Sequence, residues 1–299
     1  MRVVPFAFHA SGYGCLQWLA SRPEYEVPLV GTHAPYKDEN IWFAAVADLA
    51  HALGIPLVMF DPASIDELAH RIAKTRVDAI ISVNFRKMIP ERIYCIAPLG
   101  AYNIHDSLLP AYKGFAPSVW AMIRGETMTG VTLHEMEEEV DAGAIVGQRP
   151  VPILPEDGIS DLIHRLATES VALLAEALPR IVAGTAERRL QEPGSGFFMP
   201  RRSAKDDYVD WTWTGRALAD FVRAVAPPIT FSRCRLGTAE LRLDRVAPVT
   251  TPGSGRPAGT VLAVDGNWME VQAGDGPVRV LFHPLSPEDG RPVVGDRLT

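Results

Sequence analysis

The first hundred residues alternate short apolar, β-branched runs with amphipathic segments, and this alternation limits the fold more than any other feature. Apolar runs followed by amphipathic segments in this order build a parallel sheet with helices on both faces. The sequence therefore predicts a doubly wound α/β domain, whose ligands bind beyond the carboxyl ends of the strands. Ser64 and Glu67 have the spacing of a capping box at the start of the third helix. The expected elements are strands at 3–8, 25–33, 55–60 and 79–83, and helices at 15–20, 41–53 and 65–74.

The composition changes near residue 192, where a Pro- and Gly-rich connector runs to Pro200. Such connectors are typical of domain boundaries, so we expect one domain at 1–200 and a second at 201–299. Beyond Pro228 the pattern becomes one of short alternating segments separated by Gly, Pro and Asp-Gly turns, which predicts a small antiparallel barrel. Its expected strands are 231–236, 239–246, 260–264, 268–272 and 278–282.

The overall composition narrows the class of protein. Apolar residues make up 47% of the chain and charged residues 22%, which is enough for a sizeable core. The net charge of −7 argues against nucleic acid and anionic membrane as partners. The three cysteines form no Cys-x-x-Cys pair, so neither a disulfide framework nor a zinc site is indicated. No signal peptide or apolar run of membrane-spanning length is evident, and we expect a cytoplasmic protein. A homo-oligomer is left open.

The most distinctive polar chemistry lies between Gly100 and Gly147. Asn103 and His105 are two residues apart in a strand-like run, so their side chains should leave the same face. Asp141 follows in an Asp-Ala-Gly sequence that is typical of a turn. Taken singly, these are an ordinary polar pair and an ordinary turn. Together they place an amide, an imidazole and a carboxylate where they could converge.

The whole stretch resembles the signature of the formyltetrahydrofolate-dependent formyltransferases. The resemblance is carried, in order and spacing, by Asn-Ile-His-Asp-Ser-Leu-Leu-Pro at 103–110, Lys-Gly at 113–114, Ala-Pro at 116–117, Gly-Val-Thr-Leu-His at 130–134 and Asp-Ala-Gly-Ala-Ile-Val at 141–146. It is strongest to amino-sugar N-formyltransferases such as the aminoarabinose formyltransferase domain. Ornithine-type siderophore formyltransferases and methionyl-tRNA formyltransferase are also similar. The resemblance implies a Rossmann-like catalytic domain followed by a small β-barrel (OB-like) C-terminal domain.

The same resemblance implies roles for individual residues. Asn103, His105 and Asp141 are the implied catalytic set, and N10-formyltetrahydrofolate is the implied co-substrate. An amide can donate to the oxyanion of acyl transfer, and an imidazole can donate to it or relay a proton. Ordinary core packing is the alternative role for the apolar residues of the implied folate site. That site comprises Phe85, Arg86, Met88, Ile89, Ser107, Leu108, Leu109 and Asp141.

The sequence says less about the acceptor of the formyl group than about its donor. The resemblance implies N-formylation of a small soluble amine, either a nucleotide-linked amino sugar or an ornithine-like amino acid. Lys113 and Phe115 are the candidate substrate-binding residues, although Phe115 replaces a basic residue of the aminoarabinose enzyme. Methionyl-tRNA formyltransferase and a protein that only binds or hydrolyses formyltetrahydrofolate are the alternatives. We expect no metal, because His105, His134 and Asp141 lack the close spacing typical of metal ligands.

Overall fold

The computed structural model describes residues 1–37, 39–249, 254–286 and 290–299. The chain forms two compact units, each of which is described by itself. The first unit contains residues 1–117, 128–152 and 162–200. The second contains residues 201–299 together with two earlier segments, 118–127 and 153–161.

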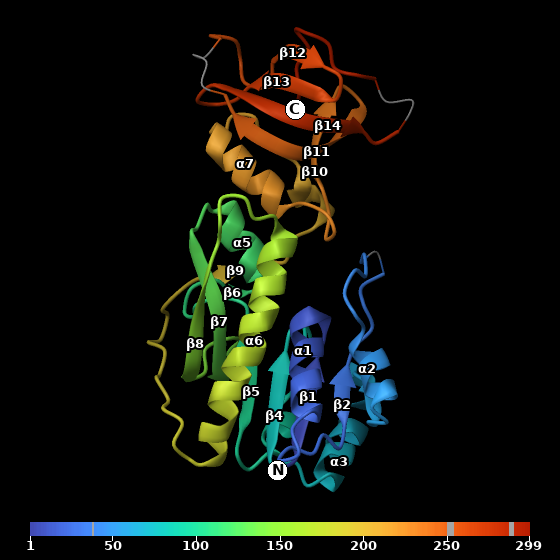
Figure 1. The fold of residues 1–299 in the computed structure, drawn as a ribbon, viewed down its shortest axis with the longest axis vertical. Coiled ribbons are helices and arrows are strands. Elements are labelled where there is room, and N and C mark those ends of the chain that lie inside the picture. Colours follow the sequence, from blue (N-terminus) through green and yellow to red (C-terminus); the bar gives the residue numbers. More distant parts are fainter. Residues whose placement is uncertain (38, 250–253, 287–289) are drawn as a thin grey trace. The chain divides into compact units, whose positions relative to one another are not determined.

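A seven-stranded sheet forms the centre of the first unit (Figure 1), with strand order β3-β2-β1-β4-β5-β7-β8. The five strands from β3 to β5 in this order are parallel, and β7 and β8 are antiparallel to their neighbours. A separate ladder pairs β6 (Lys113–Gly114) with β9 (Phe198–Met199). The sheet strands are β1 (Val3–Ala7), β2 (Val30–Thr32), β3 (Leu57–Met59), β4 (Ala79–Val83), β5 (Ala101–His105), β7 (Met128–Glu135) and β8 (Ile145–Pro152).

Helices cover both faces of this sheet, because the strand side chains alternate between the faces. Val4, Phe6 and Ile80 pack in one apolar cluster with residues of α3 and α4. Ala7 and Val30 pack in another cluster with residues of α1 and α2. The doubly wound α/β domain expected from the sequence is therefore confirmed. The helices that begin in or belong to this part of the chain are α1 (His9–Ala20), α2 (Val46–Ala52), α3 (Ile65–Lys74), α4 (Glu91–Tyr94), α5 (Pro117–Ile123) and α6 (Ile159–Val182).

Several local expectations were wrong. The helix expected at 41–53 is only Val46–Ala52, and the helix expected at 15–20 begins at His9. The strand expected at 25–33 is reduced to β2 (Val30–Thr32) and an isolated bridge between Glu26 and Arg2. Pro28, which lies between them, has no N–H to donate to a ladder. The capping box at Ser64 and Glu67 does not form, since Ser64 makes no side-chain cap hydrogen bond. A 3₁₀ turn at Pro62–Ser64 precedes α3 instead, and the Asp61 carboxylate accepts the Ala63 N–H at 2.9 Å.

The second unit is a five-stranded antiparallel sheet with order β10-β11-β14-β13-β12 and the helix α7 (Gly215–Ala224). The end of the chain closes the sheet on itself, because Leu298 bridges Leu236 on β10 and Arg297 bridges Thr260 beside β12. This closed sheet is the small β-barrel expected from the sequence. Its strands are β10 (Ser232–Leu236), β11 (Ala239–Pro248), β12 (Val261–Asp265), β13 (Trp268–Gln272) and β14 (Pro277–Pro284).

Apolar side chains of the strands and of α7 fill the interior of this second unit. Leu218 and Phe221 of α7 are buried in one cluster with Leu241, Val271 and Phe282 of the strands. Thr214 caps the helix by accepting the Ala217 N–H at 3.1 Å. Among the described residues, no helix combines the length and the apolar character that crossing a membrane requires.

Candidate active site

β5 presents Asn103 and His105 on one face of the sheet. The strand alternates, so Tyr102 and Ile104 are buried on the opposite face. In the antiparallel pairing of β5 with β7, Asn103 lies directly opposite His134. His105 and His134 are buried, whereas Asn103 is partly exposed. Asn103 is therefore the member of this group that a ligand reaches most easily.

Asp141 completes the group from the loop that joins β7 to β8. Its Oδ2 atom accepts the Gly114 N–H at 2.8 Å and lies 3.5 Å from Nδ1 of His105. Its Oδ1 atom lies 3.5 Å from Nε2 of His134. The structure thus brings the three predicted catalytic residues, Asn103, His105 and Asp141, to one place around a fourth residue, His134.

The loop that carries Asp141 has an unusual backbone. Asp141 has φ of +55°, a left-handed conformation that few non-glycine residues adopt. Gln191 holds the loop in place, because its Nε2 atom donates to the carbonyls of Asp141 at 2.9 Å and Gly143 at 2.8 Å. Backbone strain of this kind persists only where surrounding contacts stabilise it, and it often marks a functional site.

Backbone carbonyls define which ring nitrogens of the two histidines carry hydrogen. A carbonyl oxygen can only accept, so Nε2 of His105 donates to Tyr112 O at 2.8 Å, and Nδ1 of His134 donates to Glu135 O at 2.8 Å. In the neutral rings, Nδ1 of His105 and Nε2 of His134 are therefore unprotonated, and both of these nitrogens face Asp141. The site consequently contains two proton acceptors next to one carboxylate.

The Asp141 carboxyl has opposing influences on its pKa. Burial alone would raise the pKa, but the charges that His105 and His134 carry when they are protonated, together with the Gly114 N–H, hold it well below its usual range. Asp141 is therefore an anion near neutral pH. Its contribution to stability is complete above about pH 4, the ordinary carboxyl value, and is lost only as the pH falls through the lower folded-state pKa.

The segment after β5 is anchored from β7 and β8. The Thr132 hydroxyl donates to Ser107 O at 2.6 Å and accepts the Leu109 N–H at 3.1 Å. Gln148 adds hydrogen bonds from Nε2 to the Thr132 hydroxyl and to Leu109 O, both at 2.9 Å. This network gives residues 107–109 a defined position beside the group formed by Asn103, His105, His134 and Asp141.

The residues predicted for the folate site fall into two kinds of environment. Phe85 and Ile89 are buried in the core, and the Phe85 ring packs at 5.0 Å against that of Phe6. Met88 between them is 62% exposed. The guanidinium of Arg86 makes two hydrogen bonds of 2.8 Å to the Glu39 carboxylate.

The second group of predicted folate residues lies in the anchored segment after β5. Leu109 and Ser107 are buried, and the Ser107 hydroxyl donates to Ala111 O at 2.7 Å. Leu108 is partly buried. Among all the predicted folate residues, Met88 thus has the most accessible side chain, and Leu108 and Arg86 are partly accessible. The side chains of Phe85, Ile89 and Leu109 support the backbone around them.

The two residues predicted to bind the acceptor differ in exposure. Lys113 is 3% exposed, and its ammonium lies 5.7 Å from the centre of the Phe198 ring. Phe115 is 45% exposed and Phe198 is 53% exposed. Because Gly114 between Lys113 and Phe115 is bonded to Asp141, this aromatic surface begins one residue from the site.

Sequence reasoning assigned no role to His134 or Gln191. His134 was visible in the Gly-Val-Thr-Leu-His string and alternates toward the same face as Thr132, but its position opposite Asn103 depends on the register of two strands. Gln191 carries no local signal, because it lies far along the chain from the loop that it holds. Within the described parts of the chain, no group of three or more His, Cys, Asp or Glu residues is arranged to hold a metal ion.

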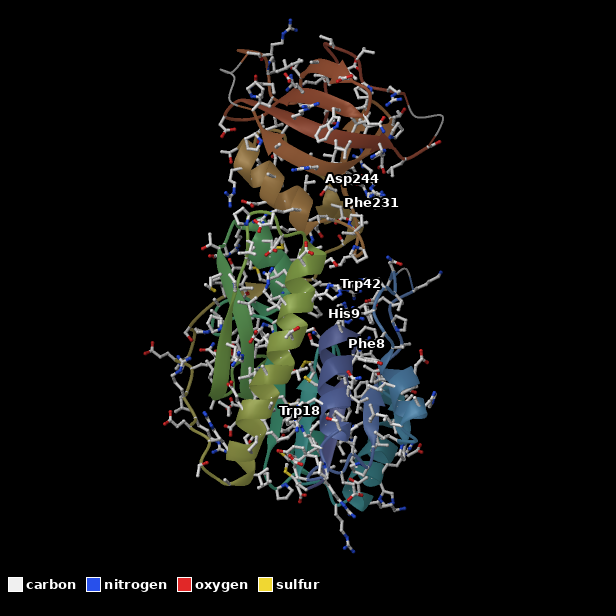
Figure 2. The ribbon with its side chains drawn as sticks, viewed as in Figure 1. Phe8, His9, Trp18, Trp42, Phe231 and Asp244 are labelled. Carbon is white, nitrogen blue, oxygen red and sulfur yellow. The ribbon has the colours of Figure 1, made fainter. Side chains whose placement is uncertain are left out.

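A cluster of aromatic and histidine rings lies where β1 is followed by α1 (Figure 2). His9, the first residue of α1, packs at 4.0 Å against the Phe43 ring and at 5.1 Å against Trp42. The preceding Phe8 stacks at 4.1 Å on His33. Burial first, and then the charge of Arg86, lower the pKa of His9 to about 4.

Comparison with family models gives two matches along the chain. Residues 50–178 match the model described as formyl transferase. Residues 202–297 match the model described as formyl transferase, C-terminal domain. The two matches together span most of the chain, and the first contains Asn103, His105, His134 and Asp141.

Similar solved structures have the same fold. WlaRD, a sugar 3N-formyl transferase crystallised with dTDP and 5-N-formyl-THF, superposes with a TM-score of 0.69 at 16% identity, over 96% of this chain and 98% of that one. An N-formyltransferase from Helicobacter canadensis, in complex with folinic acid and dTDP-3-aminofucose, gives 0.70 at 17% identity over 94% and 98%. HypX from Aquifex aeolicus with tetrahydrofolic acid gives 0.64 at 21% identity over 96% of this chain, which spans only 44% of HypX.

Proposed function

Because the chain belongs to the formyl transferase family, we propose that it transfers the formyl group of N10-formyltetrahydrofolate to the primary amine of a small acceptor. The observation that carries the proposal is the convergence of Asn103, His105 and Asp141. The folate ligands of WlaRD, of the Helicobacter canadensis enzyme and of HypX support the choice of donor.

The reaction needs an oxyanion stabiliser. The acceptor nitrogen attacks the formyl carbon, the carbonyl oxygen becomes negatively charged, and the bond from that carbon to N10 then breaks. Asn103 is partly exposed and can donate an N–H to this oxygen without changing its own charge. Removal of comparable donors in other enzymes costs about 3–4 kcal/mol of transition-state stabilisation.

The reaction also needs a proton acceptor, because the attacking amine becomes an ammonium. Nδ1 of His105 is unprotonated in the neutral ring and lies 3.5 Å from Asp141. It can take the ammonium proton, and the Asp141 carboxylate then stabilises the imidazolium. The same proton can return to N10 as that nitrogen leaves, so the atoms balance without a covalent enzyme intermediate.

For the acceptor we favour a nucleotide-linked amino sugar over an ornithine-like amino acid. The exposed rings of Phe115 and Phe198 begin one residue from Gly114, and aromatic surfaces of this kind stack on bases and sugar rings. The dTDP present with WlaRD and the dTDP-3-aminofucose in complex with the Helicobacter canadensis enzyme support the same choice. The net charge of −7 argues against methionyl-tRNA.

A panel of acceptors tests the proposal. The protein is mixed with N10-formyltetrahydrofolate and, in separate reactions, with dTDP- and UDP-linked amino sugars, ornithine, charged initiator tRNA or no acceptor. Tetrahydrofolate release and the mass of each acceptor are followed together, with Asn103→Ala as the control of strongly reduced activity. A formylated amino sugar supports the proposal. Release of formate without acceptor indicates a hydrolase, and folate binding without turnover of any acceptor indicates a binding protein; either result overturns it.

A further inference from the structure

The hydrogen bond between Asn103 and His134 has only one allowed direction. Nδ2 of Asn103 lies 3.1 Å from Nε2 of His134. Because Nδ1 of His134 already donates to Glu135 O, Nε2 of the neutral ring carries a lone pair and can only accept. The Asn103 amide must therefore turn its NH₂ group toward the ring, and one of its two hydrogens is used there.

The second hydrogen of that NH₂ group is the one that matters for transfer. We propose that His134, as the neutral ring protonated at Nδ1, is a positioning residue that holds the Asn103 amide with its donor toward the formyl oxygen. The inference rests on the proposed function, since it concerns the same oxyanion. His134 itself touches neither donor nor acceptor in this role, and acts through Asn103.

Protonation of His134 at Nε2 would remove the acceptor that holds the Asn103 amide in this orientation. A proton on Nε2 turns that nitrogen into a donor, directed at Asp141 Oδ1 at 3.5 Å or at the amide. Nε2 can then no longer accept a hydrogen bond from Asn103. The Asn103 amide would have to rotate so that its Oδ1 accepts from Nε2, and this rotation moves its NH₂ group away from the formyl oxygen. The oxyanion would lose its donor.

The groups that face His134 are Asn103 on β5, Asp141 in the loop between β7 and β8, and the Glu135 carbonyl on its own strand. Of these contacts, only the one with Asn103 requires a lone pair on Nε2. Transfer should therefore depend on an acceptor at this position of the side chain.

A purely structural histidine is the alternative, and His33 provides a matched control for it. His33 is also 3% exposed, and its Nδ1 donates to the carbonyl of the next residue, Ala34, at 2.8 Å. Its Nε2 atom has no hydrogen-bond partner among the residues that the structure describes. Replacement of His33 thus removes the same backbone bond from a buried histidine without touching an amide.

The experiment compares His134→Gln with His134→Leu. Glutamine can present a carbonyl oxygen to Asn103 and does not titrate, whereas leucine offers no acceptor. We expect His134→Leu to lower kcat by about tenfold to a hundredfold, part of the loss known for a whole oxyanion donor, with the KM for the folate little changed. His134→Gln should recover most of kcat, because the glutamine oxygen can accept from Asn103. His33→Leu should lower kcat by less than His134→Leu does.

A double variant provides the sharpest kinetic test. If His134 acts through Asn103, adding His134→Leu to Asn103→Ala should lower kcat no further than Asn103→Ala does alone. Fully additive losses, an unchanged kcat in His134→Leu, or a kcat in His134→Gln as low as that of His134→Leu would each overturn the proposal.

Nuclear magnetic resonance separates this inference from the proposed function, because it needs no turnover and no soluble leucine variant. In the ¹⁵N-labelled protein at neutral pH, His134 should show the Nδ1-protonated tautomer and the Asn103 side-chain amide should show a hydrogen bond to Nε2. An Nε2-protonated neutral ring would overturn the inference even if formyl transfer is demonstrated, and the predicted tautomer would support it even if the acceptor panel fails.

Discussion

His9 couples the stability of the fold to pH, because its partly buried ring has a lowered pKa. Its pKa is lowered to about 4 by burial and by the charge of Arg86, with Glu39 acting in the opposite direction and His164 adding to the lowering. In the unfolded chain the ring titrates near about 6.5. Between these two pH values the His9 ring is protonated in the unfolded chain but not in the folded chain. The free energy of unfolding therefore falls as the pH drops from about 6.5 to about 4.

This difference leads to a measurable prediction for His9→Gln, which removes the titrating ring. Between pH 7 and pH 5 the wild-type protein should lose about 1–2 kcal/mol of unfolding free energy more than His9→Gln does. Urea unfolding at the two pH values measures this. His51→Gln, a change at an exposed histidine, should keep the wild-type pH dependence. Equal pH dependence in His9→Gln and the wild type would contradict the prediction.

At the scale of one element, the loop between β7 and β8 depends on a close backbone contact. A Cβ atom on Gly143 would lie 2.0 Å from Glu135 O, and Glu135 N–H donates to Ala144 O at 2.9 Å across the same turn. The Glu135 carbonyl cannot move away from such a Cβ without breaking the hydrogen bond between Glu135 N–H and Ala144 O. Only glycine therefore allows the loop to return so tightly and direct Asp141 at His105.

Gly143→Ala should consequently displace Asp141 and lower kcat by about tenfold or more, together with a loss of about 1–3 kcal/mol in stability, as overpacking typically causes. Steady-state kinetics and thermal unfolding measure the two effects. Gly276→Ala is the matched control, because a Cβ there would meet no atom of the described residues within 4 Å. A wild-type kcat in Gly143→Ala would contradict this prediction, because it would show that the loop accommodates a Cβ at residue 143 without displacing Asp141.

At the scale of the whole molecule, residues 118–127 and 153–161 belong to the second unit although they precede it in the chain. Ile123 packs against the apolar core of that unit. Arg223 donates to the carbonyls of Leu154 at 2.8 Å and Asp157 at 3.2 Å, and it also pairs with Asp220. These segments therefore depend on residues beyond 200 for their apolar and polar partners.

A chain that ends at Pro200 should accordingly be less stable than the full chain. Removal of those partners exposes Ile123 and leaves the carbonyls of Leu154 and Asp157 without their donor, and we expect the thermal midpoint to fall by about 5 °C or more. Calorimetry of the two chains measures the difference. An unchanged midpoint would show that 118–127 and 153–161 fold without the second unit.

The sequence by itself determined the class of both units and part of the site. Strand alternation, helical spacing and turn residues are local properties, and they were sufficient for the doubly wound sheet, the barrel and the common face of Asn103 and His105. They failed at Pro28, which has no N–H donor and shortens the expected strand, and at Ser64, where a 3₁₀ turn forms in place of the expected capping box.

The tertiary structure alone decided which distant groups meet. The register of β5 against β7 places His134 opposite Asn103, and the path of the chain brings Gln191 to the loop that holds Asp141. Tertiary packing also assigned Phe85 and Ile89 to the core. Register and loop position depend on hydrogen bonds and burial between segments far apart in the chain, and no local pattern encodes them.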